Sequence, residues 1–307
     1  MTRNLNGKST ADDVVEGLDL SAQRILVTGA NTGIGFDTAR ALAAAGATVI
    51  VPCRTQAKSD DTAARIRTAH PDARVETGVL DLGDFASVQA CADALGSAPL
   101  HTLIANAGLT SLEWGTTTEG IEQTVGVCHF GHFLLARRLM PNLLATDAPR
   151  VVMVSSESHR SPRRLDFDRF PLTEDGYKGL IAYGQAKLCN VFFARSLQAR
   201  YGDRGLTACS LHPGTLITTD IGRNSTFVSV LMKLVSPLTK NCNQGAATTV
   251  WGATHEPAAE LQGAYLRDCA VGESTSESKD AAAADRLWSL SEDVLAQYLE
   301  DAVPAWP

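Results

Sequence analysis

The segment IAYGQAKLCN, which starts at Ile181, contains two side chains that could work as a chemical pair. Tyr183 and Lys187 are four residues apart, and on an α-helix such side chains lie one above the other on the same face. A phenol with a transferable proton and a positively charged ammonium could therefore share one pocket. The spacing alone leaves open a simple pair of surface residues, so the rest of the chain must decide.

A glycine-rich turn supplies the first independent evidence for a binding site. In VTGANTGIG, three glycines stand between a hydrophobic run and the start of a helical pattern: Gly29, Gly33 and Gly35. Residues without a Cβ allow positive φ values and let backbone N–H groups approach a pyrophosphate at a helix N-terminus. We interpret this turn as a dinucleotide-binding site that includes Asn31, Thr32 and Ile34. A glycine-rich connector without a ligand is the alternative.

The end of the second apolar run indicates which dinucleotide would bind. About 20 residues after the turn the chain carries Cys53 and Arg54 instead of an acid, and the next acids are Asp60 and Asp61. A carboxylate would accept a hydrogen bond from a ribose 2′-hydroxyl, whereas a guanidinium binds a 2′-phosphate. The sequence therefore favours NADP(H) over NAD(H). A solvated Arg54 without such a role remains the alternative.

Short apolar runs alternate with helix-length segments from Arg24 onward. This alternation is typical of βαβ units and predicts a parallel sheet with helices on both faces. We expect one domain over residues 21–307, preceded by an N-terminal arm over 1–20. The apolar stretch 223–244 is expected to be an insertion before a helix that starts near Gly245. This insertion is either a packed surface helix or a lid over an apolar ligand.

Composition excludes several classes of protein. The 307-residue chain is 44% hydrophobic and has a net charge of −7 without a dense basic stripe, which argues against a nucleic-acid partner. Its seven cysteines show no pattern typical of a zinc site or a disulfide framework. The chain has no apolar run of membrane-spanning length and no leader-like start. We expect a soluble cytoplasmic protein without a membrane span and without a bound metal.

Six short motifs occur in the order found in the short-chain dehydrogenases/reductases, and the chain resembles that family over about residues 20–295. The branch it resembles most contains the retinol dehydrogenases and the oxidoreductase domain of WW-domain oxidoreductases. The resemblance implies a single-domain Rossmann fold, a doubly wound sheet of seven mostly parallel strands. The motifs are the glycine turn, Asp81–Leu82, Asn106–Gly108, Ser155–Ser156, Tyr183 with Lys187, and His212–Gly214.

The resemblance also implies roles for these residues. Tyr183 would be the general acid/base, Lys187 would stabilise its phenolate and bind the nicotinamide ribose, and Ser156 would hold the substrate oxygen. A serine that only caps a helix would fit Ser155 or Ser158 better. Further cofactor contacts would come from Asp81, Leu82, Asn106, Ala107, Gly108, Pro213, Gly214 and Thr218.

One position departs from the branch. The usual VNHLGHF is VCHFGHF here, so Cys128 stands where an asparagine would hold a water that links the lysine to solvent. A thiol is a weak hydrogen-bonding group. Three outcomes are open: proton relay by another route such as His129 or a backbone-bound water, reduced turnover, or cofactor binding without carbonyl reduction.

The function expected from all of these observations is an NADP(H)-dependent oxidoreductase that transfers hydride between nicotinamide and a carbonyl or alcohol of a small hydrophobic substrate. The alternative is a cofactor-binding sensor or interaction protein of the same fold with impaired catalysis. Epimerisation or dehydration on this fold is a further alternative. By resemblance, a homodimer or homotetramer would pair through two long helices at 119–144 and 181–201, although members of this branch can be monomeric.

Overall fold

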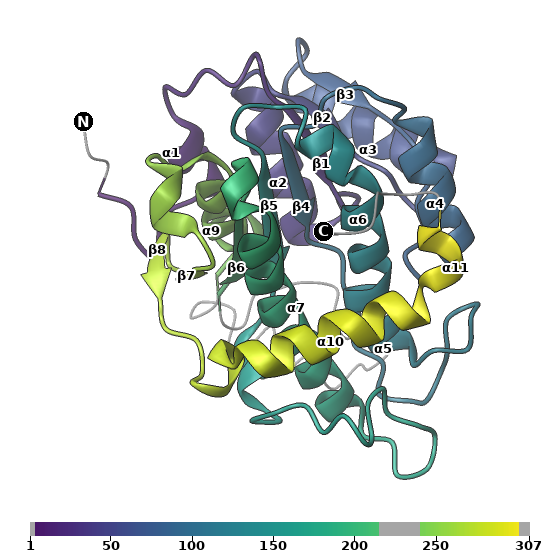
Figure 1. Ribbon diagram of the computed structural model, residues 1–307. Helices are drawn as coiled ribbons and strands as arrows, with labels where there is room; N and C mark the ends of the chain where they lie inside the picture. Colours follow the sequence, from purple (N-terminus) through teal and green to yellow (C-terminus); the bar gives the residue numbers. More distant parts are fainter. Residues whose placement is uncertain (1–3, 215–239, 301–307) are drawn as a thin grey trace, which may run out of the picture.

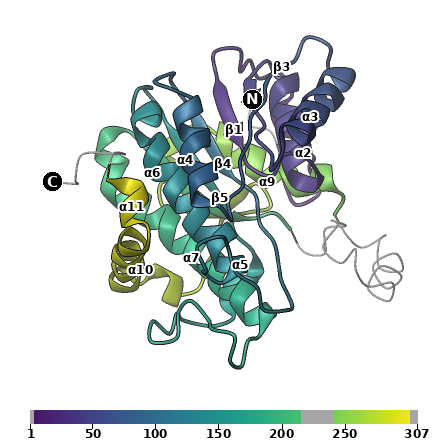
Figure 2. The same ribbon diagram turned by 90° about the vertical axis from the view of Figure 1, so that its right-hand side faces the viewer.

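The computed structural model describes residues 4–214 and 240–300. In this part of the chain, helices cover both faces of a central sheet (Figures 1 and 2). The strand order is β3-β2-β1-β4-β5-β6-β7-β8. Neighbouring strands are parallel, except that β8 pairs antiparallel with β7 at one edge. The expected doubly wound α/β class is confirmed, and β8 adds an eighth strand to the seven that the family resemblance implied.

The central strands are buried because their sequences are almost continuously apolar, as parallel strands covered on both faces require. Every residue of β4, β5 and β6 is buried. The bounds of the strands are β1 Arg24–Val27, β2 Thr48–Ile50, β3 Arg74–Glu76, β4 Thr102–Ala105, β5 Arg150–Val154, β6 Thr207–His212, β7 Tyr265–Arg267 and β8 Ala270–Gly272.

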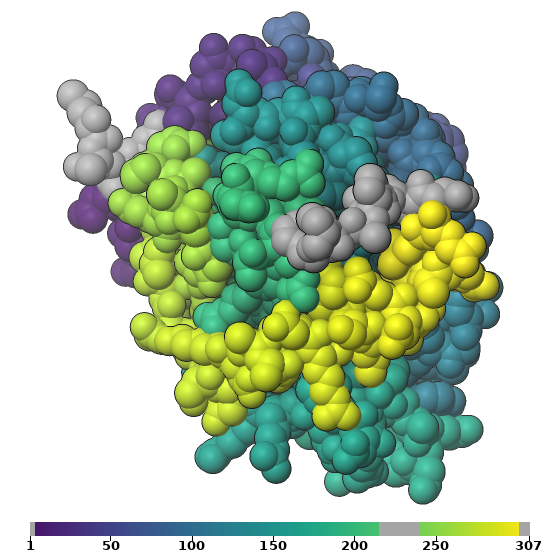
Figure 3. All heavy atoms as spheres, viewed as in Figure 1, coloured from purple at the N-terminus to yellow at the C-terminus, as the bar shows by residue number. Residues whose placement is uncertain are grey.

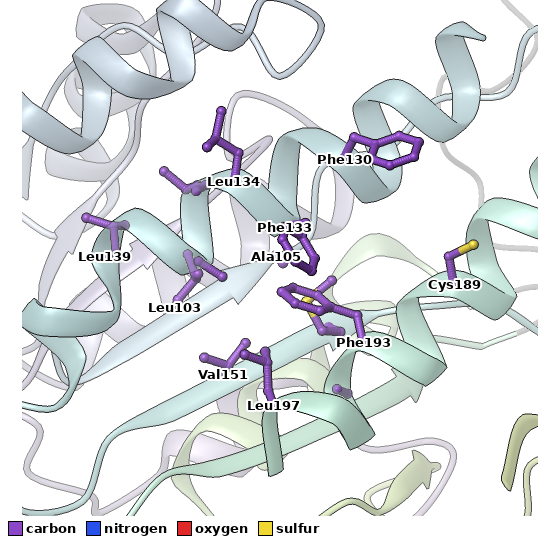
Figure 4. Close-up of a cluster of buried hydrophobic side chains, with 14 of the residues drawn as sticks. Leu103, Ala105, Phe130, Phe133, Leu134, Leu139, Val151, Cys189, Phe193 and Leu197 are labelled. Atoms are coloured by element: carbon purple, nitrogen blue, oxygen red, sulfur yellow. The ribbon is translucent and has the colours of Figure 1, made fainter. Parts of the chain in front are cut away.

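Two hydrophobic clusters fill the space between the sheet and its helices. Helices α1, α2, α3 and α9 contribute to one cluster, while α4, α6, α7 and α10 contribute to the other. In the second cluster Phe133 and Phe193 lie 4.9 Å apart between their ring centres (Figure 4). The helix bounds are α1 Ala11–Val15, α2 Gly33–Ala44, α3 Gln56–Ala69, α4 Phe85–Ala94, α6 Gly131–Leu143, α7 Gly179–Tyr201, α9 Cys242–Thr254, α10 Ala281–Val294 and α11 Ala296–Leu299.

The long helix expected over 119–144 forms, but its middle turn is widened. It begins as α5 (Gln123–Val125), continues as a π-helical turn, η1 (Gly126–Phe130), and ends as α6. A π-turn inserts an extra residue into the helical ladder and is frequent at functional sites. Cys128 lies in the middle of this turn.

The start of the chain packs against the body of the molecule through α1. Val14 and Val15 are buried, and Asp12 binds both Arg40 of α2 and Asn243 of α9. The backbone N–H of Ala11 also donates to Oδ1 of Asn243, at 2.9 Å. The region expected to be an arm therefore holds α2 and α9 together.

Helices α10 and α11 close the opposite side of the molecule, and Figure 3 shows them as a yellow band across that face. Trp288 of α10 is buried and lies between the guanidinium groups of Arg137 and Arg200. Helix α10 of the same chain thus partly covers the outer surfaces of α6 and α7.

Most of the expected insertion, residues 223–239, lies outside the described residues. Helix α9 begins at Cys242, three residues before the expected start.

Candidate active site

The turn between β1 and α2 has the geometry of a phosphate cradle. Gly29 and Gly33 have φ values of +67° and +59°, in the left-handed region that favours glycine. A Cβ on Gly35 would lie 2.3 Å from the carbonyl oxygen of Gly29 and 2.4 Å from Nδ2 of Asn106. Because Gly29, Gly33 and Gly35 carry no side chains, they leave room for a phosphate to approach the backbone N–H groups at the start of α2.

A cavity of about 1110 Å³ opens at this turn. It lies where the strand order reverses between β1 and β4, the position at which open α/β sheets bind their ligands. The structure brings together here most of the residues expected to bind cofactor. They are Gly29, Asn31, Thr32, Gly33, Ile34, Gly35, Cys53, Arg54, Asp81, Leu82, Asn106, Ala107 and Gly108.

Two cations line the end of this cavity beyond β2. Arg54, the residue expected to contact a 2′-phosphate, is exposed and lines the cavity, and Lys58 in the first turn of α3 joins it. Lys58 was not singled out from the sequence, although its distance of four residues from Arg54 across a helix start could have indicated it. The nearby acids point to other partners, since Asp60 accepts from Gln56 and Asp61 pairs with Arg65.

The side chains of Cys53 and Asp81 are both engaged within the protein at the wall of the cavity. Cys53 is buried, and burial raises the pKa of its thiol. The Asp81 carboxylate accepts from the N–H of Gly83 at 2.9 Å, while the N–H of Asp81 donates to Oγ of Ser87 at 3.0 Å. These bonds fix the loop after β3 at the wall of the cavity.

Lys187 is held in the interior by α7. Its side chain is almost fully buried, and Nζ donates to the carbonyl oxygen of Val154 at 3.1 Å. Nδ2 of Asn190, one turn further along α7, donates to the same oxygen at 3.1 Å. The ammonium lies 5.4 Å from the centre of the ring of Tyr183, which is half-buried. The pair therefore lies at the sheet, and the alternative of a simple surface pair does not apply.

Ser156 lies two residues after the end of β5, the strand whose last residue, Val154, binds Lys187. Its Oγ accepts from the N–H of Ser158 at 3.2 Å and caps the 3-10 turn η2 (Glu157–Arg160). The expectation that a capping role would fit Ser155 or Ser158 better is not met, because Ser155 instead donates to the carbonyl oxygen of Lys187 at 2.7 Å. That bond ties the end of β5 to α7.

The segment after Ser156 packs directly on α7 beside Tyr183. A Cβ on Gly184 would lie 1.6 Å from the carbonyl oxygen of Ser161 and 2.9 Å from that of Ser158. Glycine is thus required at this contact. Ser156, Tyr183 and Lys187 come from two elements in direct contact at the carboxyl end of the sheet.

Gly108 connects this group to the cofactor cavity. A Cβ at Gly108 would lie 3.2 Å from Nζ of Lys187 and 3.3 Å from Sγ of Cys128. Gly108 lines the cavity, as does Leu180, which precedes Tyr183 by about one helical turn. Ser156, Tyr183 and Lys187 are not part of that lining. Of the three, Lys187 is next to the lining residue Gly108.

The remaining expected contacts lie after β6. Pro213 is buried, and Gly214 has a φ of +130°. A Cβ on Gly214 would lie 2.6 Å from Cδ of Lys240. Neither residue lines the cavity, and Thr218 lies outside the described residues.

A buried acid fixes the outer wall of the cavity. The carboxylate of Glu122 accepts from the N–H groups of Thr124 and Val125, both at 2.8 Å, and from the hydroxyl of Tyr177 at 2.9 Å. That hydroxyl also lies 3.1 Å from the carbonyl oxygen of Ser111, a cavity residue. Burial raises the pKa of Tyr177 to about 12. This network was not expected from the sequence.

The two most exposed large hydrophobic residues in the described part of the chain lie at the cavity. They are Leu112, 73% exposed, and Leu180, 70% exposed. Exposed apolar side chains grouped beside a cavity are typical of a ligand-binding edge.

His129, considered above as a route for proton relay, lies on the other side of its helix. Its Nε2 is 2.9 Å from Oγ of Ser291 in α10, and its ring packs against Phe193. Burial lowers its pKa to about 3.

Cys128 is fully buried, and its thiol donates weakly to the carbonyl oxygen of Leu109 at 3.7 Å. Only Cys128 of these two residues lies beside Lys187.

Within residues 4–214 and 240–300, none of the helices is long and apolar enough to cross a membrane. No group of three or more histidine, cysteine, aspartate or glutamate side chains in these ranges is arranged to hold a metal ion.

Comparison with known proteins agrees with this geometry. The profile of the short chain dehydrogenase family matches residues 23–166. The chain is 40% identical over 302 residues to the WW domain-containing oxidoreductase of Gallus gallus, across 96% of this chain and 73% of that protein. It is 35% identical over 280 residues to retinol dehydrogenase 12 of Homo sapiens, across 91% and 88% of the two chains. The chain belongs to the short-chain dehydrogenase/reductase family, a family of oxidoreductases.

Solved structures show the same fold. A crystal structure of a putative uncharacterized protein from Mycobacterium paratuberculosis is similar, with a TM-score of 0.75 and 30% identity over 94% of this chain and 98% of that one. An NADPH-bound short chain oxidoreductase from Pseudomonas aeruginosa PAO1 matches with a TM-score of 0.66 and 22% identity over 81% and 96%. The second similarity concerns the fold alone.

Proposed function

We propose that the protein is an NADP(H)-dependent oxidoreductase that transfers hydride between nicotinamide and a carbonyl or alcohol of a hydrophobic substrate. The observation that carries the proposal is the position of Lys187. Its ammonium is anchored on the carbonyl of Val154, faces the ring of Tyr183 and lies against Gly108 at the inner end of the cavity. Within residues 4–214 and 240–300 no carboxylate forms an ion pair with this ammonium. A buried charge of this kind is costly and is consistent with a functional role.

The residues present fit a dinucleotide. The cradle at Gly29–Gly35 would be filled by any Cβ at Gly35, and the cavity of about 1110 Å³ exceeds the ~300–1,000 Å³ typical of smaller ligands. Gly29 and Gly33 would approach the pyrophosphate, Asp81 and Leu82 the adenine, and Asn106–Gly108 the nicotinamide half. Pro213, Gly214 and Thr218 are proposed for the nicotinamide end. When bound, the cofactor supplies or accepts the hydride.

The preference for NADP(H) rests on Arg54 and Lys58. Both side chains are exposed and line the same end of the cavity, where a 2′-phosphate would accept charge-assisted hydrogen bonds. The carboxylates in the described lining of the cavity are Asp81 and Glu113, and the Asp81 carboxylate already accepts from the N–H of Gly83.

The chain's own groups have distinct roles in the proposed reaction. In the reductive direction Ser156 Oγ would hold the carbonyl oxygen and Tyr183 would donate its proton to that oxygen. Lys187 would stabilise the resulting phenolate and bind the nicotinamide ribose. In the oxidative direction the same groups would remove the proton from an alcohol.

A hydrophobic substrate is proposed because of the apolar edge formed by Leu112 and Leu180. These residues lie on the loop before α5 and at the start of α7, so the substrate would enter between those two segments. A lid at 223–244 remains part of the proposal and concerns residues that mostly lie outside the described part of the chain.

The proposal also covers location and assembly. We place the protein in the cytoplasm on the basis of its cysteine content.

Pairing of two subunits through α6 and α7 would have to include α10, since Trp288 of α10 already packs against that surface. Light scattering of the wild-type protein and of a Trp288→Ala variant would show whether a homodimer or homotetramer forms there.

The test is consumption of NADPH over a panel of apolar ketones and aldehydes, with Tyr183→Phe compared with Tyr201→Phe. Both changes remove one hydroxyl from α7, but 18 residues of helix separate them by about 27 Å. We expect Tyr183→Phe to lower kcat at least 100-fold, in line with the usual contribution of a general acid, and Tyr201→Phe to retain activity. Undiminished turnover in Tyr183→Phe would refute the assigned acid. If the wild-type protein binds NADPH but reduces nothing on the panel, the cofactor-binding alternative is favoured.

A further inference from the structure

We propose that His132 is a positioning residue for the proposed cofactor site: as a neutral Nδ1–H imidazole it orients the hydroxyl of Thr28 and the carbonyl of Cys128, and thereby fixes the Asn106–Gly108 turn. The inference rests on the proposed nicotinamide cofactor. His132 is fully buried in α6 and is not part of the lining of the cavity at the glycine turn, so it acts on that cavity only through its neighbours.

The hydrogen bonds around Thr28 determine the direction of each proton. Oγ1 of Thr28 accepts from the backbone N–H groups of Asn106 and Ala107, at 3.0 and 2.9 Å. The N–H of Asn106 is shared with the carbonyl of Ile104, also at 3.0 Å, and the two N–H groups together occupy the acceptor side of the hydroxyl oxygen. Its single hydrogen is left to donate, and Nε2 of His132 lies 2.8 Å away. The other acceptor, the carbonyl of Ile104, is more distant at 3.4 Å and already accepts from two N–H groups.

The second nitrogen of the ring completes the assignment. Since Nε2 accepts from Thr28, the proton of a neutral ring is on Nδ1. Nδ1 lies 3.0 Å from the carbonyl oxygen of Cys128, which can only accept. A doubly protonated ring would leave its Nε2–H without an acceptor. Burial, with the charge of Lys187 nearby, lowers the pKa of His132 to about 4 and agrees with a neutral ring.

The imidazole thus links the two sides of Gly108. On one side Thr28 fixes the N–H groups of Asn106 and Ala107, directly before Gly108. On the other side the Cys128 carbonyl is fixed, and Sγ of the same residue borders the Gly108 position. Nζ of Lys187 also borders Gly108. Loss of the imidazole would therefore make the Asn106–Gly108 turn more mobile at the place where the nicotinamide half of the cofactor would bind.

His129 provides a matched control three residues away. It is buried to the same degree, and it also makes one hydrogen bond to a hydroxyl, that of Ser291. Its contacts are with Phe130, Phe133 and Phe193 on the side of α10, not with the cofactor cavity. His129→Leu and His132→Leu should therefore disturb packing similarly. They differ in that His132 loses a second hydrogen bond, to the Cys128 carbonyl, and in that only His132 is bonded to residues beside the cofactor cavity.

The test compares His132→Leu, His132→Gln and His129→Leu in the full chain. Gln can still accept from Thr28 through Oε1, whereas Leu cannot. Two quantities are measured: the NADPH dissociation constant from nucleotide fluorescence, and hydrogen exchange of a peptide that covers residues 103–110. We expect His132→Leu to weaken NADPH binding at least tenfold, because it removes the hydrogen bonds to both the Thr28 hydroxyl and the Cys128 carbonyl, and to accelerate exchange in that peptide. His132→Gln should recover most of both losses, and His129→Leu should change neither.

A double-mutant cycle keeps the inference testable if one variant is only weakly stable. Thr28→Val removes the hydroxyl itself but leaves the bond from His132 to the Cys128 carbonyl, so adding His132→Leu to it should lower NADPH affinity by clearly less than His132→Leu does in the wild-type protein. Equal effects of His132→Leu and His129→Leu at matched loss of Tm, or additive effects in the cycle, would overturn the inference. If the wild-type protein binds neither NADPH nor NADH, the proposed function fails, and the exchange measurement alone decides on the role of His132.

Discussion

The ammonium nitrogen of Lys187 lies 5.4 Å from the centre of the Tyr183 ring and donates at the same time to the carbonyl of Val154. The carbonyl bond fixes the position of the charge independently of Tyr183. The charge is therefore in place before a substrate or cofactor arrives, which is what electrostatic stabilisation of a phenolate requires.

Replacing Lys187 by methionine should keep the volume of the side chain and remove its charge. We expect kcat to fall at least 100-fold and the NADPH dissociation constant to rise severalfold, because both proposed roles are lost. Steady-state kinetics and nucleotide fluorescence measure the two effects. An unchanged kcat would contradict the role assigned to the ammonium.

Arg54→Ala and Lys58→Ala should each weaken NADPH binding about tenfold, the value of one charge-assisted hydrogen bond, and leave NADH binding within about twofold. Arg67→Ala is the control. Arg67 is an exposed cation on α3, the helix that carries Lys58; it donates to the carbonyl of Val75 and lies outside the cavity lining. Isothermal titration with both nucleotides separates the cases. Equal losses for NADPH and NADH would rule out a 2′-phosphate contact.

Cys128→Asn should increase kcat if the thiol impairs proton relay from Lys187, while Cys128→Ser, closer in size, should not. The position is fully buried, so a lower Tm from overpacking is expected as well. The measurement is kcat in H₂O and D₂O, because a relay step that limits turnover gives a solvent isotope effect. Identical kinetics for all three proteins would mean that the site has compensated for the missing amide.

Gly184→Ala should reduce kcat at least tenfold, because its Cβ would collide with the carbonyl of Ser161 and displace the segment that follows Ser156. Gly78→Ala is the control, since its Cβ would meet only Cβ of Pro52 at an ordinary 3.8 Å. Activity and thermal unfolding of both variants are compared. Full activity in Gly184→Ala would show that Ser156 does not depend on this contact.

Stability should decrease as the pH falls from 7.5 to 5.5. Burial lowers the pKa of His129 to about 3 and that of His132 to about 4, whereas an unfolded histidine has a pKa near 6.5. The unfolded chain therefore binds more protons in this range, and each histidine should lower the free energy of unfolding by about 1 kcal/mol between pH 6.5 and 5.5. Urea denaturation should show a smaller pH dependence in His129→Leu, and an undiminished dependence would argue against a neutral His129.

Local sequence patterns predicted the parts of the site that depend on short spacings. The glycine turn, the Tyr183–Lys187 pair and Arg54 could be identified because each lies within one turn or one strand end. The bond between Thr28 and His132 could not, since it joins residues 104 positions apart and depends on how α6 packs on the sheet. The antiparallel edge strand β8 is only three residues long, too short for a periodic pattern to show.

The contact between α1 and α9 affects the order in which the chain can fold. The bond from Ala11 to Asn243 spans 232 positions in the sequence. Asp12 of α1 can already pair with Arg40 of α2 when the first part of the chain has been made, but the contact with α9 has to wait until Cys242–Thr254 has been synthesised. The packing of α1 is thus completed in two stages that are separated by most of the sheet.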